Sequence, residues 1–296
     1  MPELPEVETV RRGLQPVMEN ARFKNVTVNR PNLRFPFPDG LSNQLRGCIV
    51  SNLGRRAKYL VAELDNGTAL VMHLGMSGSF RIELADGVTM PGTFYQPRSE
   101  AKAHDHVIFE MEGEFGAAHI IYNDPRRFGF MDLVPTAELT SCKHFSHMGM
   151  EPTGNQLNGE TLSGLFAGKS APLKAALLDQ RLIAGLGNIY VCEALWRSRL
   201  SPKRMAKTIT RRDGKSTVRS EVLALHIRDV IAEAIEAGGS SLRDHRQTNG
   251  ELGYFQHRFK AYDREGEACA KADCDGTIAR INQSGRSTFY CPRCQK

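Results

Sequence analysis

Four cysteines within the last twenty-eight residues constrain the fold of this chain more than any other feature. They form two close pairs, with four residues inside the first pair, two inside the second and sixteen between the pairs: Cys269, Cys274, Cys291 and Cys294. Thiolates in two pairs joined by a spacer of hairpin length can surround one tetrahedral Zn²⁺ ion. Two disulfide bonds are the alternative.

The rest of the chain favours zinc over disulfides. No secretory signal is present, and the three other cysteines are isolated, as in a reduced cytosolic protein: Cys48, Cys142 and Cys192. The four-residue spacing of the first pair departs from the common two-residue spacing, but it removes no ligand. Because sulfur fills all four positions, no position remains for a catalytic water. We therefore expect a structural zinc, and chemistry elsewhere.

Length and charge indicate the class of partner. With 296 residues, the chain is long enough for two domains and a small metal module. A net charge of +6 and a sequence pI near 9.0 favour a polyanionic partner such as nucleic acid. Short basic clusters support this, although each alone is more typical of a solvated surface: Arg11-Arg12, Arg55-Arg56 with Lys58, Arg126-Arg127, Lys203-Arg204, Arg211-Arg212 and Arg243 to Arg246. No apolar run approaches the roughly twenty residues of a membrane helix, so we expect no membrane partner.

The first half of the chain has the pattern of a β-sandwich preceded by a helix. Apolar residues at helical spacing predict an amphipathic helix over residues 5–18: Val7, Val10, Leu14 and Val17. From residue 22 to about residue 134, short β-branched and aromatic stretches alternate with turns, which predicts antiparallel strands. Residues 84–103 lack periodicity and contain two prolines, so we expect a surface insertion there.

After Pro135 the pattern becomes helical. Residues 173–178, 189–196 and 217–237 have helical periodicity, and Gly238-Gly239 follows as a C-cap. A glycine turn precedes the second helix, but Tyr190 stands where a dinucleotide-binding motif needs its third glycine, so we reject that motif. Residues 239–253 are polar and bounded by glycine, which predicts a loop. We expect an α+β multidomain protein with domains at residues 2–135, 136–255 and 256–296.

The segment His104-Asp105-His106 invites a metal hypothesis, because two histidines flank a carboxylate. Polar and apolar residues alternate around it, however. This alternation favours a strand with one solvent-facing side.

The N-terminal sequence suggests a nucleophile. Proline after the initiator methionine favours removal of Met1, which would leave Pro2 as the terminal residue. An α-amine has an ordinary pKa of about 7.7–8.0, against about 10.4 for lysine, so more of it is unprotonated at neutral pH. A secondary amine that attacks a sugar aldehyde carbon forms an iminium, and Glu3 could move the proton involved. The alternative is that these residues only begin a helix.

Six segments, in order from residue 2 to residue 296, resemble the formamidopyrimidine-DNA glycosylase family: Pro2-Glu-Leu-Pro-Glu-Val-Glu-Thr9, Gly54-Arg-Arg-Ala-Lys58-Tyr59, His73-Leu-Gly-Met76-Ser-Gly78, Asn123-Asp-Pro-Arg-Arg-Phe-Gly129, Gly187-Asn-Ile-Tyr190 and the four-cysteine module. The resemblance implies a bifunctional enzyme that excises oxidised purines, chiefly 8-oxoguanine and formamidopyrimidines, from duplex DNA and then cleaves the abasic site. It also implies an N-terminal β-sandwich, a helix–two-turn–helix domain and a zinc hairpin, in agreement with the local patterns.

The resemblance implies roles for four residues in the chemistry. Pro2 is the expected nucleophile at C1′ of the damaged nucleotide, and Glu3 the acid/base residue that assists opening of the sugar ring. Glu6 is a carboxylate that supports the site. Lys58 is expected to contact phosphate and to assist the elimination steps.

The resemblance also implies six DNA-binding residues. Three fill the space that a flipped base leaves: Met76, Arg126 and Phe128. Three lie near the lesion or its phosphates: Lys174, Asn188 and Arg286. The loop within residues 239–253 is expected to close over the flipped base.

Two alternatives to a purine-directed enzyme stay open. One is an enzyme similar to endonuclease VIII, which prefers oxidised pyrimidines, although the intact Asp124-Pro-Arg-Arg-Phe128 segment favours the purine branch. The other is a non-catalytic zinc protein that binds damaged DNA, which the retained Pro2, Glu3 and Lys58 disfavour. We expect one Zn²⁺, no redox cofactor, double-stranded DNA as partner, a monomer, and a bacterial cytoplasmic protein associated with the nucleoid.

Overall fold

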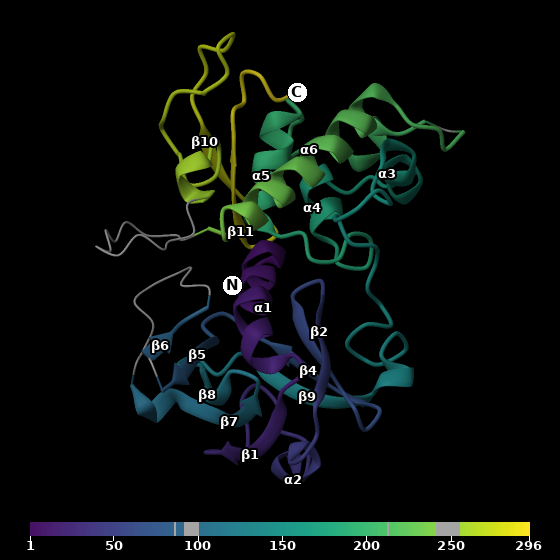
Figure 1. Cartoon of the computed structure of the whole chain (residues 1–296). Coiled ribbons are helices and arrows are strands. Elements are labelled where there is room, and N and C mark those ends of the chain that lie inside the picture. Colours follow the sequence, from purple (N-terminus) through teal and green to yellow (C-terminus); the bar gives the residue numbers. More distant parts are fainter. Residues whose placement is uncertain (86, 92–100, 212, 241–254) are drawn as a thin grey trace. The chain divides into compact units, whose positions relative to one another are not determined.

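The chain forms two compact units in the computed structural model, which describes residues 1–85, 87–91, 101–211, 213–240 and 255–296. We call the first the sandwich unit; it comprises Met1–Ser146 with the described part of Ala237–Tyr254. The second, the helical unit, comprises His147–Glu236 and Phe255–Lys296 (Figure 1).

The sandwich unit begins with the predicted helix, α1 (Leu4–Met18). Glu3 is its N-cap and Pro5 lies in its first turn, where a missing backbone N–H costs no hydrogen bond. The apolar face at helical spacing is buried, as at Val10 and Leu14. The prediction of an amphipathic helix is confirmed.

Two antiparallel sheets follow, as predicted. The five-stranded sheet has the order β1 (Arg22–Val28), β7 (Asp105–Gly113), β8 (Gly116–Asn123), β5 (Ser79–Leu84) and β6 (Gly87–Thr89). The four-stranded sheet has the order β2 (Val50–Arg56), β3 (Tyr59–Leu64), β4 (Thr68–His73) and β9 (Phe130–Pro135). Short helices connect strands at α2 (Leu41–Leu45) and η1 (Lys102–His104), and η2 (Thr136–Glu138) follows β9.

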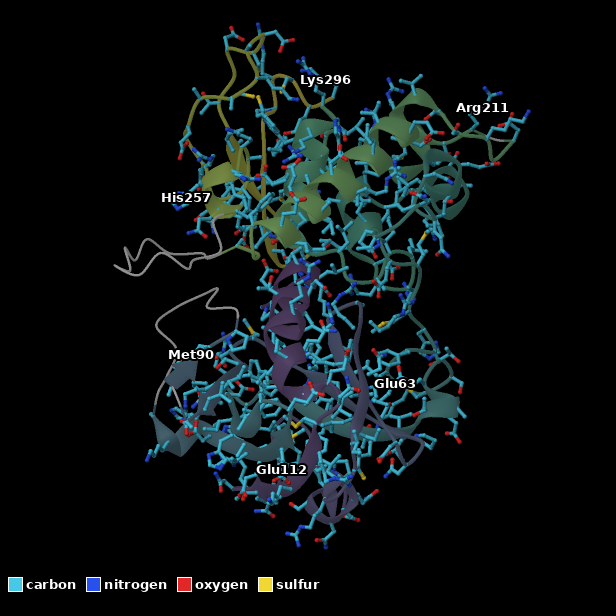
Figure 2. All side chains as sticks on the ribbon, in the orientation of Figure 1. Glu63, Met90, Glu112, Arg211, His257 and Lys296 are labelled. Atoms are coloured by element: carbon cyan, nitrogen blue, oxygen red, sulfur yellow. The ribbon has the colours of Figure 1, made fainter. Side chains whose placement is uncertain are left out.

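One hydrophobic core joins both sheets and α1. Phe23 and Phe109 of the five-stranded sheet pack edge to face at 5.5 Å in this core, and Leu60 and Leu70 come from the other sheet. Each fully buried side chain of this size stabilises the fold by about 1.5–3 kcal/mol. The outer side is polar: Glu112, labelled in Figure 2, extends from β7 and pairs with Lys24 at 2.9 Å.

Two local expectations need correction. Part of the predicted insertion forms a strand, β6, because Gly87–Thr89 pairs with the end of β5. The strand expected at His104-Asp105-His106 begins only at Asp105, as β7, and its first two residues are buried rather than solvent-facing: Asp105 binds Arg81 at 2.9 Å, and the ring of His106 bonds the Asp124 carbonyl at 2.9 Å. Buried partners therefore replace water there.

The helical unit contains four α-helices among its described residues, of which the sequence patterns predicted three. These helices are α3 (Gly159–Phe166), α4 (Leu173–Leu178), α5 (Asn188–Arg197) and α6 (Val218–Glu236), with short turns η3 (Ala206–Ile209) and η4 (Phe255–Arg258). Helix α3 was not predicted, because two of its eight residues, Gly159 and Gly164, are glycines, which have a low helix propensity. The unit ends in a hairpin of β10 (Ala279–Gln283) and β11 (Arg286–Tyr290), and β11 packs along α5 (Figure 1).

Candidate active site and nucleic-acid interface

The N-terminal corner of the sandwich unit is built around a buried carboxylate. One oxygen of Glu6 accepts the backbone N–H of Glu3 at 2.9 Å, in a reciprocal capping arrangement at the start of α1. Its other oxygen accepts the backbone N–H and the hydroxyl of Ser240, both at 2.9 Å. Glu6 thus fixes the residues next to Pro2 and the chain at Ser240. Of the predicted lesion-capping loop, only Gly239 and Ser240 lie within the described residues.

Charged groups surround the terminal amine at this corner. Burial lowers the pKa of the Met1 α-amine; the carboxylates of Glu3 and Glu6 oppose this, whereas Lys58 and Arg126 reinforce it, and the result lies below the ordinary value. The structure thus brings together residues that are far apart in the sequence. A low pKa keeps more of an amine unprotonated, as a nucleophile requires.

Lys58 owes its position to a tight turn. It follows Ala57 in the two-residue connection between the paired residues Arg56 and Tyr59. Ala57 has a φ of +52°, in the left-handed region, which costs a residue with a Cβ atom about 1 kcal/mol. The Lys58 side chain is buried. A strained backbone position therefore directly precedes the expected catalytic lysine.

An ion pair fixes this turn relative to α1. Arg55 donates to the carbonyl of Ala57 at 2.8 Å and to the Glu8 carboxylate of α1 at 3.2 Å. Burial raises the pKa of Glu8, but hydrogen bonds from Arg11 and Arg12 outweigh burial and lower it. Glu8 therefore stays charged and keeps the helix and the turn together.

The loops that carry Met76 and Phe128 are joined by a hydrogen-bond network. The Ser77 hydroxyl donates to the buried Asp124 carboxylate at 2.5 Å and accepts the Arg126 backbone N–H at 3.1 Å. The other oxygen of Asp124 accepts the Gly129 backbone N–H at 2.8 Å. The two loops therefore lie together, although more than forty residues separate them in the sequence.

Glycine is required where these loops meet. A Cβ atom on Gly75 would lie 2.3 Å from the carbonyl carbon of Phe128, and the φ of Gly75 is +60°. A Cβ atom on Gly129 would lie 1.8 Å from the Tyr122 hydroxyl oxygen. No side chain larger than hydrogen fits at either position without moving the backbone.

The residues expected to insert into the duplex project from the place where these two loops meet. Met76 and Phe128 are 40% and 43% exposed, which is unusual for large apolar side chains. The Arg126 guanidinium lies 5.0 Å from the centre of the Phe128 ring, a cation–π contact. The structure thus places all three predicted residues on one pair of adjoining loops.

His73 is a site residue to which the sequence analysis assigned no role. Burial, with Lys58, Arg34 and His144 nearby, lowers its pKa to about 4, so the ring is neutral at physiological pH. Its Nδ1 accepts the Gly75 backbone N–H at 3.0 Å, which leaves Nε2 as the protonated nitrogen. Only its place in the segment of residues 73–78 could have indicated it.

The helical unit gathers its three predicted residues around one backbone carbonyl. Asn188, the first residue of α5, donates to the Ser287 carbonyl at 2.9 Å. Lys174 of α4 donates to the same carbonyl at 3.2 Å and to the Thr288 hydroxyl at 2.6 Å. Exposed Arg286 precedes Ser287 in the chain. Lys174 is buried beneath the hairpin rather than displayed on the surface.

The four C-terminal cysteines of the helical unit converge. A tetrahedral site with Zn–S bonds of about 2.3 Å places sulfur atoms about 3.8 Å apart. The Sγ atoms of Cys269 and Cys294 are 3.8 Å apart, and those of Cys274 and Cys291 are 3.6 Å apart. All four lie within 4.8 Å of one another. These separations fit one zinc ion and are too long for disulfide bonds.

Comparison with known proteins agrees with this geometry. Residues 1–131 match the profile of the formamidopyrimidine-DNA glycosylase N-terminal domain, residues 148–246 that of the H2TH domain of formamidopyrimidine-DNA glycosylase, and residues 266–296 that of a zinc finger found in FPG and IleRS. Proteins named formamidopyrimidine-DNA glycosylase from Chelativorans sp. (strain BNC1) and Rhizobium etli (strain CIAT 652) are 63% and 58% identical, over the full length of both chains. The chain belongs to the formamidopyrimidine-DNA glycosylase family.

Solved structures of the family share the fold. A complex between a mutant of Lactococcus lactis FPG and a Fapy-dG containing DNA has a TM-score of 0.81 at 30% identity. A complex between Lactococcus lactis Fpg and an abasic site containing DNA has a TM-score of 0.80 at 29% identity. Both cover the full length of each chain.

Family membership establishes what kind of protein this is. It is a DNA repair enzyme of the bifunctional glycosylase and abasic-site lyase type, with the predicted β-sandwich, helix–two-turn–helix domain and zinc finger. Its cofactor is one structural Zn²⁺ at the four cysteines. Among the described residues, no helix is long and apolar enough to cross a membrane.

Proposed function

We propose that the protein excises 8-oxoguanine and formamidopyrimidines from duplex DNA through a Schiff base on Pro2, and then cleaves the strand by β,δ-elimination. The observation that carries this proposal is the N-terminal corner of the sandwich unit. There the Met1 α-amine, one residue before Pro2, lies among Glu3, Glu6, Lys58 and Arg126, and its pKa is below the ordinary value. This is a suitable environment for an amine nucleophile with an acid/base residue beside it.

The chemistry follows from these groups. After removal of Met1, the neutral Pro2 nitrogen attacks C1′ of the damaged nucleotide, the electron pair of the N-glycosidic bond leaves with the base, and the departing base takes up the proton that Pro2 loses. A proton from Glu3 on O4′ opens the sugar ring and gives an iminium between Pro2 and C1′. Loss of a C2′ proton expels the 3′ phosphate, a second elimination expels the 5′ phosphate, and Lys58 balances the phosphate charge.

Two sets of side chains would hold the DNA. Met76, Arg126 and Phe128, which the Asp124 network keeps together, fill the duplex where the damaged base has left it. Asn188 lies at the start of α5, where backbone N–H groups favour anions, and the exposed guanidinium of Arg286 in β11 supplies a positive charge, so we assign both to phosphates. Lys174 contributes by holding the hairpin that carries Arg286.

The proposal extends to organisation and setting. We assign the catalytic domain to residues 2–135, the helical DNA-binding domain to residues 136–255 with the lesion-capping loop 239–253, and the zinc hairpin to residues 256–296. The partner is double-stranded DNA that contains oxidised bases, as in the Lactococcus lactis complexes with Fapy-dG and abasic-site DNA. The protein acts as a monomer in the bacterial cytoplasm, associated with the nucleoid.

Borohydride trapping tests the central step. Protein confirmed by mass to lack Met1 is incubated with an end-labelled duplex carrying 8-oxoguanine opposite cytosine, reduced, and run on a denaturing gel. A slow covalent band, mapped to Pro2 by peptide mass, is the expected result. Absence of both a band and strand cleavage would overturn the proposal. A band with thymine glycol alone would instead favour a pyrimidine-directed enzyme, and binding without cleavage of either substrate a non-catalytic protein.

Glu3→Gln tests the acid/base role. Removing a positioned acid/base group lowers a rate by about 10²–10⁴-fold, so we expect single-turnover excision to fall by this factor. Glu19→Gln is the matched control, because Glu19 caps the opposite end of the same helix. Equal excision rates for the two variants would contradict the assignment of Glu3.

A further inference from the structure

The only tryptophan of the chain lies against a zinc ligand. Trp196 is in the last turn of α5 and is 7% exposed. Its indole N–H donates to the Sγ atom of Cys269 at 3.4 Å, within the distance of a hydrogen bond to sulfur. Both side chains belong to one small hydrophobic cluster with Ile278 and Phe289. The indole therefore contacts the thiolate from a side that water does not reach.

The unusual four-residue spacer between Cys269 and Cys274 also contacts Trp196. Lys271, inside this spacer, places its Nζ atom 4.5 Å from the centre of the Trp196 ring. The same ammonium donates to the backbone carbonyl of Arg197 at 3.2 Å. A carbonyl in the last turn of a helix has no partner within the helix, and a cation is favoured there. Through Lys271, the spacer therefore holds the C-terminal end of α5.

The second cysteine pair rests on the chain that follows α5. Gln295, which is buried, donates to the Leu200 carbonyl at 2.8 Å and accepts the Cys291 backbone N–H at 2.7 Å. Arg199 pairs with Asp273 of the spacer. Both halves of the cysteine cluster are thus attached to residues 196–200.

We propose that Trp196 and Lys271 are positioning residues for the zinc site, which hold the Cys269 thiolate in its ligating orientation from the end of α5. A hydrogen bond to a ligating atom fixes its direction and balances part of its charge, and losing such a partner typically lowers metal affinity 10–100-fold. Lys271 covers the indole and keeps its N–H aimed at sulfur. The tests of this inference measure the zinc site and do not depend on the proposed glycosylase chemistry.

The arrangement gives α5 a second task. Its first residue, Asn188, holds the hairpin at the Ser287 carbonyl, and its last turn holds Cys269 through Trp196. The zinc ion and the candidate phosphate site are therefore coupled through one short helix. Loss of the contact between Trp196 and Cys269 should therefore leave the contact between Asn188 and Ser287, at the other end of α5, less firmly held.

Trp196→Phe in the full-length protein tests the proposal, because phenylalanine keeps most of the ring and removes the N–H donor. We expect the zinc dissociation constant, measured by competition with a chromophoric chelator, to rise about tenfold. Lys271→Met, which keeps the aliphatic stem, should raise it by a smaller factor of about three. Tyr262→Phe is the control, since it removes a polar group from a residue packed against the same cluster and should change zinc affinity less than twofold. Wild-type affinity in a folded Trp196→Phe variant would overturn the proposal.

A second measurement needs no variant and so remains valid if Trp196→Phe fails to fold. Because Trp196 is the only tryptophan, fluorescence excited at the long-wavelength edge of absorption, where the seven tyrosines absorb little, reports on the surroundings of this indole. Removal of zinc by a chelator should change the emission intensity, and adding zinc back should restore it. Emission that stays constant while zinc is lost would contradict a contact between the indole and a ligating thiolate.

Discussion

Lys58 in the sandwich unit and Lys174 in the helical unit are both buried, with 7% and 1% of their surface exposed, but their surroundings differ. Lys58 lies at a two-residue turn, directly after Ala57, whose backbone is in the left-handed region. Its charge acts on the terminal amine and on His73. Lys174 lies inside a helix and donates to the Ser287 carbonyl and the Thr288 hydroxyl. One lysine thus influences groups that titrate, and the other joins two elements of the fold.

This difference shows what a buried ammonium can do. Near another amine, it raises the free energy of that amine's protonated form, which lowers the pKa and makes the amine more nucleophilic. Among neutral acceptors, it donates hydrogen bonds that fix the atoms around it, and removing it leaves those acceptors without a donor. Burial of a basic residue therefore does not by itself indicate a catalytic role.

The largest expected effect that separates the two lysines is on the chemical step. Lys58→Met keeps the volume of the side chain but removes the charge, and we expect the trapping rate at saturating protein to fall about 10²-fold or more. Because Lys58 helps to lower the pKa of the Met1 α-amine, we expect it to act in the same way on the Pro2 amine once Met1 is removed, so its loss should raise that pKa. The acidic limb of the pH–rate profile should therefore move to higher pH, as measured by borohydride trapping between pH 5 and 9. A lower rate with an unmoved profile would show that Lys58 does not act through the pKa of the terminal amine.

The second effect is on the stability of the sandwich unit, through His73. Its pKa is about 4 in the folded protein, below the ordinary value of 6.5, so the unfolded chain binds the proton more tightly. Stability from this residue is therefore complete above pH 6.5 and is lost as the pH falls towards 4. The shift corresponds to about 3 kcal/mol.

The His73→Gln variant isolates this contribution. Glutamine can still accept the Gly75 backbone N–H but does not titrate in this range. Urea unfolding at pH 7 and pH 4.5 should show that the variant loses less stability on acidification than the wild type does. The carboxylates that bind protons in this range contribute to the loss in both proteins. An equal loss in both proteins would contradict the low pKa of His73, which depends on burial and on the nearby Lys58, Arg34 and His144.

Sequence patterns predicted the features that local chemistry determines. Helix α1 follows from apolar spacing within a few turns, and the zinc hairpin follows from cysteine spacing within twenty-six residues. The joint between the Met76 and Phe128 loops could not be predicted in this way. It depends on Ser77 bonding Asp124 across forty-seven residues, and on glycines whose close contacts exist only in the folded chain.

The same limit applies to buried polar residues. His106 and Lys174 look like surface residues in the sequence, because their burial depends on partners supplied by distant segments. The four-residue spacer of the first cysteine pair appeared to be only a departure from the common spacing. In the structure its Lys271 contacts α5, and no pattern within the spacer identifies that partner.

The smallest expected effect tests the positioning role of Lys174. Lys174→Met removes two hydrogen bonds to the hairpin, each worth about 0.5–1.5 kcal/mol net, so the hairpin carrying Arg286 should be held less firmly. We expect about tenfold weaker binding to a duplex with a non-cleavable abasic-site analogue, measured by fluorescence anisotropy. The trapping rate at saturating protein should stay close to that of the wild type, because Lys174 has no part in the chemical step. Lys207→Met is the control, since Lys207 lies in the same unit and donates to Ser170 on the surface. If Lys174→Met instead lowered the saturated rate as much as Lys58→Met, the distinction between the two buried lysines would be wrong, and Lys174 would have to act on the lesion itself.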